Sequence, residues 1–266
     1  MKLWFQWWQL VKQLRPACSR LQTFLWLVTC LAGITVRNDL LGVTSIVRSL
    51  GLKGFYYDRL LDFFHTPALK LEKLTRLWLA LILRQLPVLR INGRLLLVGD
   101  GLKVPKAGKK MPAVKKLHQE SESNTKPEYI FGHLCQAIAI LAGTENKVVA
   151  IPLTSRIHDG VVFSNRDQRT LLDKMILLIL SLDLQEPFYF IADAYYAGKK
   201  MVNGLLAMGK HLISRVRSNA VAYLLPEEPP TGKKKQKEAD HKNMGRKLKS
   251  RNTLRILPIC RPRPAL

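Results

Sequence analysis

Short apolar segments, turn signals and helical patterns alternate between Leu95 and Arg217, and this alternation restricts the possible fold more than any other feature. The expected elements are, in order, strands at 95–99, 129–142 and 147–157, a helix at 166–182 capped by Ser164 or Asn165, a strand at 188–192, a helix at 198–208 and a strand at 211–217. The turn at 143–146 suits a hairpin between the second and third strands. Three strands followed by helix, strand, helix and strand predict an α/β fold, with a mixed sheet and helices packed on its faces.

Residues 2–90 have a different pattern, with apolar residues three and four positions apart, which predicts a helical region. The basic residues Arg37, Arg48, Lys53 and Arg59 would suit a helix-turn-helix-like module that contacts DNA. A plain helical bundle that positions the next domain fits the same pattern. The sequence leaves both interpretations open.

The apolar stretch 21–36 is the candidate for a membrane segment in this region. A spanning helix needs about 20 mostly apolar residues. This stretch is shorter, contains Gln22 and Thr29, and is flanked by Arg20 and Arg37. A buried amphipathic helix is therefore the expected structure.

The chain carries 43 Lys and Arg residues against 19 Asp and Glu, a formal net charge of +24. So large an excess attracts polyanions, with nucleic acid the first candidate partner and an anionic membrane surface the second. Hydrophobic residues make up 47% of the chain, which excludes wholesale disorder. The four cysteines form no CxxC pair, which argues against a zinc finger or a disulfide scaffold and favours reduced thiols.

After Pro226 the composition changes again, and residues 231–251 contain nine Lys or Arg. Such a segment is either solvated surface or a contact with the phosphate backbone of nucleic acid. The sequence thus predicts three regions: a helical and possible DNA-contacting region at 1–90, an α/β core at 91–220 and a basic tail at 221–266.

Two aspartates follow apolar strands, at the strand ends where α/β sheets bind ligands. Asp100 follows RLLLVG, and Asp193 follows FYFIA. If the first and fourth strands are neighbours, the two carboxylates lie side by side and repel each other unless a cation lies between them. Carboxylate oxygens favour Mg²⁺ or Mn²⁺, and two such ions promote phosphodiester chemistry. A turn residue is the simpler interpretation for either aspartate alone, but the pair in a basic chain predicts metal-dependent phosphoryl transfer on nucleic acid.

A lysine-rich segment with flexible glycines follows Asp100, and a lysine pair follows Asp193. The expected contacts to the phosphates of a bound strand are Lys103, Lys106, Lys109, Lys110, Lys115, Lys116, Lys199 and Lys200. The alternative is a surface loop whose lysines serve solubility. His133 is expected to be a hydrogen-bonded core histidine, and His158 lies in an expected turn with no assigned role.

Three stretches resemble bacterial insertion-sequence transposases of the DDE, RNase H-like class: LLLVGDGLKVPKAGKKMPAVKKLHQESES, EYIFGH and PFYFIADAYYAGKKM. The resemblance extends over about residues 21–251. In that family the first two catalytic aspartates follow the first and fourth strands, which implies catalytic and metal-binding roles for Asp100 and Asp193. The resemblance also implies an RNase H-like fold, Mg²⁺ or Mn²⁺ as cofactor, and cleavage and strand transfer at transposon ends.

The third acid of that family is a Glu on a helix after the fifth strand, often beyond a β-rich insertion. The segment SNAVAYLLPEEPPTGKKKQ resembles the start of such an insertion. Glu227 and Glu228 lie in a proline-rich segment, and Glu238 and Asp240 lie among lysines without an apolar helical face. The resemblance therefore implies that the final catalytic helix is missing, as in a truncated or frameshifted product, and that this chain is inactive in cleavage.

The predicted function is that of an insertion-sequence transposase by descent, in the bacterial cytoplasm with the nucleoid. Its expected partners are double-stranded DNA, at the transposon terminal repeats and the target, and further copies of the same chain. No small-molecule substrate and no membrane is expected. The alternatives are a host nuclease of the same fold, a non-catalytic DNA-binding remnant that modulates an intact transposase, and a peripheral membrane protein.

Overall fold

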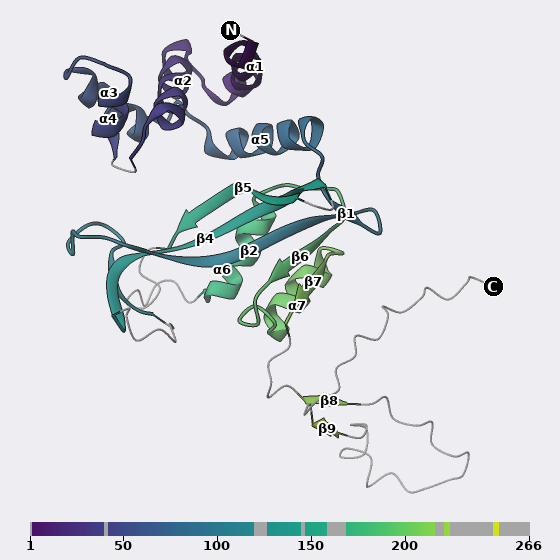
Figure 1. Cartoon of the computed structure of the whole chain (residues 1–266). Coiled ribbons are helices and arrows are strands. Elements are labelled where there is room, and N and C mark those ends of the chain that lie inside the picture. Colours follow the sequence, from purple (N-terminus) through teal and green to yellow (C-terminus); the bar gives the residue numbers. More distant parts are fainter. Residues whose placement is uncertain are drawn as a thin grey trace, which may run out of the picture.

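The chain begins with a series of helices. The computed structural model describes residues 2–39, 42–119, 127–144, 147–158 and 169–215, and the backbone of 221–223 and 247–249. Its first elements are α1 (Lys2–Val11), the 3-10 helix η1 (Lys12–Ala17), α2 (Leu21–Val36), α3 (Val43–Ser49), α4 (Tyr56–His65) and α5 (Leu71–Gln85). The helical character predicted for residues 2–90 agrees with these elements (Figure 1).

The apolar stretch that was a candidate membrane segment is α2. Its inner face packs on α3, where a Cβ atom at Gly33 would lie 2.5 Å from Ile46 Cγ2, so a larger residue would push the helices apart. Phe24 and Leu27 on the same helix are buried in the core of the N-terminal helices. No helix in the described part of the chain combines the length and the apolar character that a membrane crossing requires.

Seven strands form one sheet: β1 (Arg90–Ile91), β2 (Arg94–Pro105), β3 (Lys115–His118), β4 (Tyr129–Thr144), β5 (Lys147–Ile157), β6 (Phe188–Ala192) and β7 (His211–Ser214). Helix α6 (Leu171–Leu180) lies between β5 and β6 in the sequence, and α7 (Lys199–Ala207) lies between β6 and β7. In the tail, β8 (Val221–Tyr223) pairs antiparallel with β9 (Lys247–Lys249).

The strand order of the sheet defines its fold. β4 pairs antiparallel with β2 on one side and with β5 and β3 on the other. β6 pairs parallel with β2, and β7 pairs parallel with β6. An antiparallel meander of three strands, with two parallel strands added beside the first, is the RNase H-like arrangement. The predicted α/β fold and its order of three strands, helix, strand, helix and strand are confirmed, with β1 and β3 as additional short strands.

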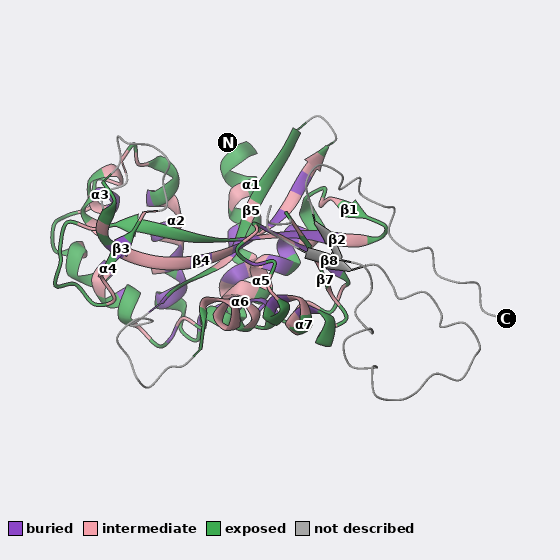
Figure 2. Ribbon diagram, turned by 90° about the horizontal axis from the view of Figure 1, so that it is seen from below, coloured by how far each residue is buried: buried purple, intermediate pink, exposed green. Residues whose placement is uncertain are grey.

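The main core lies between the sheet and the helices on its two faces. α6 and α7 cover one face and α5 lies over the other (Figure 1). Leu95, Leu97 and Phe190 on the central strands have no exposed surface. Because both faces are covered, the central strands are continuous apolar runs without polar alternation. Figure 2 shows the buried residues along the middle of the sheet, whereas β3 is mainly exposed.

Helix α5 connects the N-terminal helices to the sheet. Leu74 and Leu77 pack on the core of the N-terminal helices, whereas Leu79 and Ile82 belong to the core of the sheet. Trp78 Nε1–H donates a hydrogen bond of 2.8 Å to the carbonyl oxygen of Pro152 on β5. The division of the chain near residue 90 stays a prediction.

Helix α6 begins later than the predicted helix at 166–182. Its N-cap is Thr170, whose hydroxyl accepts a hydrogen bond from the Asp173 N–H, while the Asp173 carboxylate accepts one of 2.7 Å from the Thr170 N–H. The reciprocal pair is a capping box, which satisfies two free backbone donors of the first turn. The prediction of Ser164 or Asn165 as the cap of this helix is wrong, and both lie outside the described residues.

Strand β2 is longer than the predicted strand at 95–99 and continues to Pro105. Its burial changes abruptly: the residues up to Gly99 are buried or half-buried, and those from Asp100 to Pro105 are exposed. The exposed end lacks the continuous apolar run of the buried part, and backbone pairing with β4 maintains the strand. Asp100 therefore lies within a strand, at the position where burial ends.

A substitution at Gly99 tests how tightly the core is packed next to Asp100. A Cβ atom at Gly99 would lie 2.1 Å from Cζ of Phe190, whose ring is fully buried and cannot move away. We expect Gly99→Ala to lower the free energy of unfolding by about 1–3 kcal/mol through overpacking, measured by urea unfolding. Gly54→Ala is the control, because a Cβ atom there would meet nothing within 4 Å. Equal stability of the two variants would contradict this packing.

Candidate active site

The parallel pairing of β2 with β6 brings Asp100, on β2, and Asp193, directly after β6, to equivalent positions beyond the paired residues. The last pair in the register is Val98 with Ile191, and each aspartate follows its strand's member of that pair by two residues. Residues in register point to the same face, and neighbouring strands lie about 4.8 Å apart. Both aspartates are exposed, whereas the residue before each is buried. The two strands that precede the aspartates, β2 and β6, are therefore neighbours, which is the condition for the predicted acid pair.

One backbone hydrogen bond orients each carboxylate. The Gly101 N–H donates to Asp100 Oδ1 at 2.7 Å, and the Tyr195 N–H donates to Asp193 Oδ1 at 3.1 Å. The Ser214 hydroxyl on β7 donates to the main-chain carbonyl of Asp193 at 2.8 Å. Among the described residues, the second oxygen of each carboxylate has no hydrogen-bond or ion-pair partner. One oxygen of each carboxylate is thus available to a ligand.

Both carboxylates act on one buried hydroxyl, that of Tyr196. Burial is the main reason that the pKa of Tyr196 is raised to about 12. A hydrogen bond from Gln136 opposes this shift, and the negative charges of Asp100 and Asp193 add to it. An effect of both charges on the same oxygen is consistent with the two aspartates lying on the same side of the sheet.

This donor set fits a hard divalent cation. Mg²⁺ is commonly bound by one or two carboxylates together with water and substrate phosphates. Asp100 and Asp193 supply two exposed carboxylates, each with one available oxygen. Within the described ranges, no group of three or more His, Cys, Asp or Glu residues is placed to hold a metal ion. The acids considered for a third position, Glu227, Glu228, Glu238 and Asp240, lie outside the described residues.

A three-stranded ribbon continues from the acid pair. It consists of residues 101–118 and 129–133, which form the exposed end of β2, the loop that follows it, β3 and the start of β4, and we call it the basic ribbon. The predicted DNA contacts on it are Lys103, Lys106, Lys109, Lys110, Lys115 and Lys116. Lys103 lies in β2, and Lys115 and Lys116 lie in β3, so the alternative of a surface loop does not describe these three lysines.

Aromatic rings and backbone carbonyls support several of these lysines. Lys116 Nζ lies 4.4 Å from the centre of the Tyr129 ring, and Lys109 Nζ lies 5.1 Å from that of Phe131. Lys103 Nζ donates a hydrogen bond of 2.7 Å to the His118 carbonyl, which joins β2 to β3. Lys103 and Lys116 therefore lie on paired strands, and Lys109, in the loop between β2 and β3, lies over the ring of a residue on β4.

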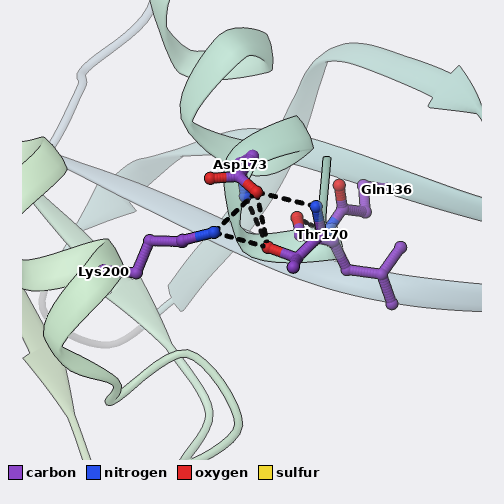
Figure 3. Close-up of polar contacts among 5 residues, drawn as sticks. Gln136, Thr170, Asp173 and Lys200 are labelled. Atoms are coloured by element: carbon purple, nitrogen blue, oxygen red, sulfur yellow. Dashed lines mark hydrogen bonds and ion pairs between the residues drawn. The ribbon is translucent and has the colours of Figure 1, made fainter. Parts of the chain in front are cut away.

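Of the lysine pair on α7, Lys200 contacts the cap of α6. Its Nζ lies 2.8 Å from Asp173 Oδ2, as Figure 3 shows. This hydrogen bond is the largest cause of the lowered pKa of Asp173, followed by the hydrogen bond from the Thr170 hydroxyl. Lys199 is exposed and makes no contact of this kind with described residues. Phosphate contact stays a prediction for both lysines.

Three buried polar residues near the acid pair were missed by the sequence analysis: Gln136, His158 and Tyr196. His158 was assigned to a turn without a role, but it is 6% exposed and directly follows β5. A signal for Gln136 was present, because a single amide within an apolar strand must find buried partners. His133 is half-buried, with Nε2 3.0 Å from the Pro112 carbonyl oxygen, in partial agreement with its prediction as a core histidine.

Comparison with known protein families decides the family. Residues 13–258 match the family described as "DDE superfamily endonuclease". The chain belongs to this superfamily. No curated protein shows significant similarity to the sequence. Among solved structures, a piggyBac transposase in a synaptic complex with hairpin DNA is similar, with 14% identity and a TM-score of 0.39. The match covers 74% of this chain and 44% of that one, so the chain spans less than half the length of that transposase.

Nucleases of the DDE superfamily generally use divalent metal ions. The two exposed carboxylates of this superfamily member agree with that requirement in the type of their oxygen donors. The roles of Asp100 and Asp193 in catalysis remain predictions.

The contact between Lys200 and Asp173 predicts a pH-dependent contribution to stability. Lys200→Met removes the contact, and since both side chains are partly exposed we expect a loss of a few tenths to about 1 kcal/mol at pH 7. Because the folded-state pKa of Asp173 lies below the ordinary value of 3.8, the contribution is present above that value and is lost as the pH falls through the lowered pKa. Urea unfolding at pH 7, 5 and 3 measures this difference.

Lys199→Met is the matched control, because it removes the same charge from the next residue of α7 without removing a described contact. Its stability should match that of the wild type at each pH. A difference between Lys200→Met and Lys199→Met that does not shrink toward pH 3 would contradict the assignment of the effect to Asp173.

Proposed function

We propose that this chain is a DNA transposase of an insertion sequence, which cleaves and joins DNA strands at transposon ends with Mg²⁺ or Mn²⁺ held by Asp100 and Asp193. The observation that carries the proposal is the pair of exposed carboxylates that lie two residues beyond the last register pair of β2 and β6, where the basic ribbon begins. Membership of the DDE endonuclease superfamily supports the reaction class.

The charge distribution supports double-stranded DNA as the partner. The net charge of +24 attracts the phosphate backbone from a distance. The basic ribbon continues β2 directly beyond Asp100, so a strand that is held by the ribbon lysines passes next to the acid pair. Contacts to phosphates do not distinguish sequences, and the proposed role of the ribbon is to position the DNA without reading its bases.

In the proposed reaction, a bound divalent ion would activate the attacking oxygen and stabilise the leaving oxygen of the phosphodiester. Asp100 and Asp193 would hold the ion through their available oxygens, while the backbone N–H groups of Gly101 and Tyr195 orient the two carboxylates. The resemblance implies a third acid, and the sequence offers none on a helix with an apolar face, so we expect this chain alone to be inactive in cleavage. The loss of one member of a cooperating catalytic set commonly costs several orders of magnitude in rate.

Asp100→Asn and Asp193→Asn test the site. Each removes one anionic ligand and changes the side-chain volume little, so we expect each to abolish Mn²⁺ binding by the DNA-free protein, measured by titration with electron paramagnetic resonance detection. Any nicking of supercoiled plasmid in Mn²⁺ should disappear as well. DNA affinity in EDTA should stay within about two-fold of wild type, because the change in net charge is small relative to +24.

Unchanged Mn²⁺ binding or unchanged nicking in either variant would overturn the site assignment. DNA binding by a wild type that neither binds Mn²⁺ nor nicks DNA would favour the alternative function, a non-catalytic DNA-binding protein that modulates an intact transposase. The absence of a third acid from the described residues is the observation in favour of that alternative.

Salt dependence tests the basic ribbon. The affinity for double-stranded DNA should fall with salt, with a log–log slope of about −0.9 for each phosphate contact. We expect the double variant Lys109→Gln and Lys116→Gln to make the slope shallower by roughly 1–2 units, measured by fluorescence anisotropy. The control is Lys73→Gln with Lys147→Gln, which removes equal charge from α5 and from the end of β5 away from the ribbon. Equal changes in both double variants would assign the effect to net charge and contradict a role for the ribbon.

A further inference from the structure

One face of the basic ribbon combines exposed rings with lysines. Asp100 on β2 is in register with Ala137 on β4, and Lys116 on β3 is in register with Phe131 on β4. Register partners point to the same face of a sheet, as does every second residue along a strand. The side chains of the ribbon that share the face of Asp100 therefore include Leu102, Val104, Lys116, His118, Tyr129 and Phe131. We call this surface the ring face.

The apolar side chains of the ring face are open to solvent. Tyr129 is 46% exposed and Phe131 is 38% exposed. Leu102 and Val104, which lie between these rings and Asp100, are also exposed. In Figure 1 the strands of the ribbon extend to the left beyond α6. Apolar groups that gather on one exposed surface indicate a site for a binding partner.

A lysine lies over each of the two rings. Lys116 Nζ is 4.4 Å from the centre of the Tyr129 ring, and Lys109 Nζ is 5.1 Å from that of Phe131. An ammonium group is held only weakly over an exposed ring, so it can move to a phosphate and leave the ring to another planar group. Each of the two positions thus offers a positive charge beside a flat apolar surface. A nucleotide, with its anionic phosphate and planar base, is complementary to both.

The arrangement of the rings favours unpaired bases. Tyr129 and Phe131 are two residues apart on one strand, which corresponds to roughly 6.6 Å. Successive nucleotides of a duplex strand advance by only about 3.4 Å. Within a duplex, both faces of a base are also covered by its neighbours. Bases that lie on the two rings have therefore left the duplex stack.

The ring face is continuous with the surface that carries the first of the two acids. Phe131 lies six residues along β4 from Ala137, the register partner of Asp100, which corresponds to about 20 Å. A DNA strand that passes the acid pair can therefore reach the rings with bases several nucleotides away from the reacting phosphate.

We propose that the ring face binds unpaired bases of the DNA strand that passes the acid pair, with Tyr129 and Phe131 as stacking surfaces and Lys109 and Lys116 as phosphate contacts. The inference rests on the proposed function, because it names the form of the DNA that this site takes. Stacking on aromatic side chains tolerates any base, so the ring face positions the strand without selecting its sequence.

The double variant Tyr129→Leu with Phe131→Leu removes both rings but keeps the lysines and an apolar side chain at each position. We expect its Kd for an oligothymidylate to rise about 10-fold or more, because each stacked base contributes to affinity. Its Kd for a blunt duplex of equal length should stay within about two-fold of wild type. Fluorescence anisotropy with the full chain in EDTA measures both constants, and thermal unfolding verifies that the variant is folded.

Two further variants separate stacking from other effects of substitution. Tyr57→Leu with Phe64→Leu is the matched control, because it removes two exposed rings from α4 and should change neither Kd. The exchange Tyr129→Phe with Phe131→Tyr keeps a ring at both positions and should retain the wild-type affinity for the oligothymidylate.

A fluorescent base reports the stacking itself. An oligothymidylate that carries one 2-aminopurine should lose fluorescence when it binds to the wild type or to the exchange variant, because stacking on a ring quenches this base. The loss should be smaller with the double leucine variant at saturating protein. Equal quenching by all three proteins would contradict base stacking on Tyr129 and Phe131.

The outcomes separate this inference from the proposed function. If the double leucine variant binds the oligothymidylate within two-fold of wild type, or loses the same affinity for the duplex, the base-binding role is overturned. A wild type that self-associates through these rings, with unchanged oligothymidylate binding in the leucine variant, would also overturn it and assign the ring face to a second copy of the chain. The proposed function stands in these cases if Asp100→Asn and Asp193→Asn abolish Mn²⁺ binding. If they bind Mn²⁺ like the wild type, the proposed function fails, and the oligothymidylate affinities still decide whether the rings bind bases.

Discussion

Parallel backbone pairing between β2 and β6 is the contact on which the candidate site depends. Two carboxylates that are far apart in the sequence come to equivalent positions because the register from Leu95 with Phe188 to Val98 with Ile191 leaves each aspartate two residues further on. Their mutual repulsion opposes this arrangement. The opposing stabilisation comes from the ladder of backbone hydrogen bonds and from the apolar core behind it, in which Phe190 packs directly against Gly99.

The abrupt change in burial along β2 divides the strand into a part that packs in the core and an exposed part that carries Asp100 and the ribbon lysine Lys103. Up to Gly99 its side chains pack in the core, and from Asp100 onward they are exposed. Exposure keeps the like charges of the acid pair in water, where their repulsion is weak, and leaves oxygens accessible to an ion. The same exposed extension forms the basic ribbon with β4 and β3, where Lys103 and Lys116 lie on paired strands although the chain as a whole has a net charge of +24.

Sequence reasoning was accurate where local pattern decides the structure. Apolar runs and turn signals located the central strands, and the strand predicted at 188–192 has the bounds of β6. It was less accurate at element ends, where tertiary contacts decide. The start of α6 depends on the Thr170–Asp173 capping box and its contact with Lys200 from another helix. The length of β2 depends on its pairing with β4, since its exposed end lacks the continuous apolar run of its buried part.

The sequence by itself determined the class of fold, the family and the two candidate acids, because alternating apolar segments, the motifs around Asp100 and Asp193, and a large positive charge are all visible in one dimension. Only the tertiary structure decided that Tyr196, Gln136 and His158 form one hydrogen-bonded group beside those acids. The physical reason is that a buried polar side chain is stable only with hydrogen-bond partners, and these partners come from different strands and turns. Their separation in the sequence carries no information about the angles and distances of hydrogen bonds.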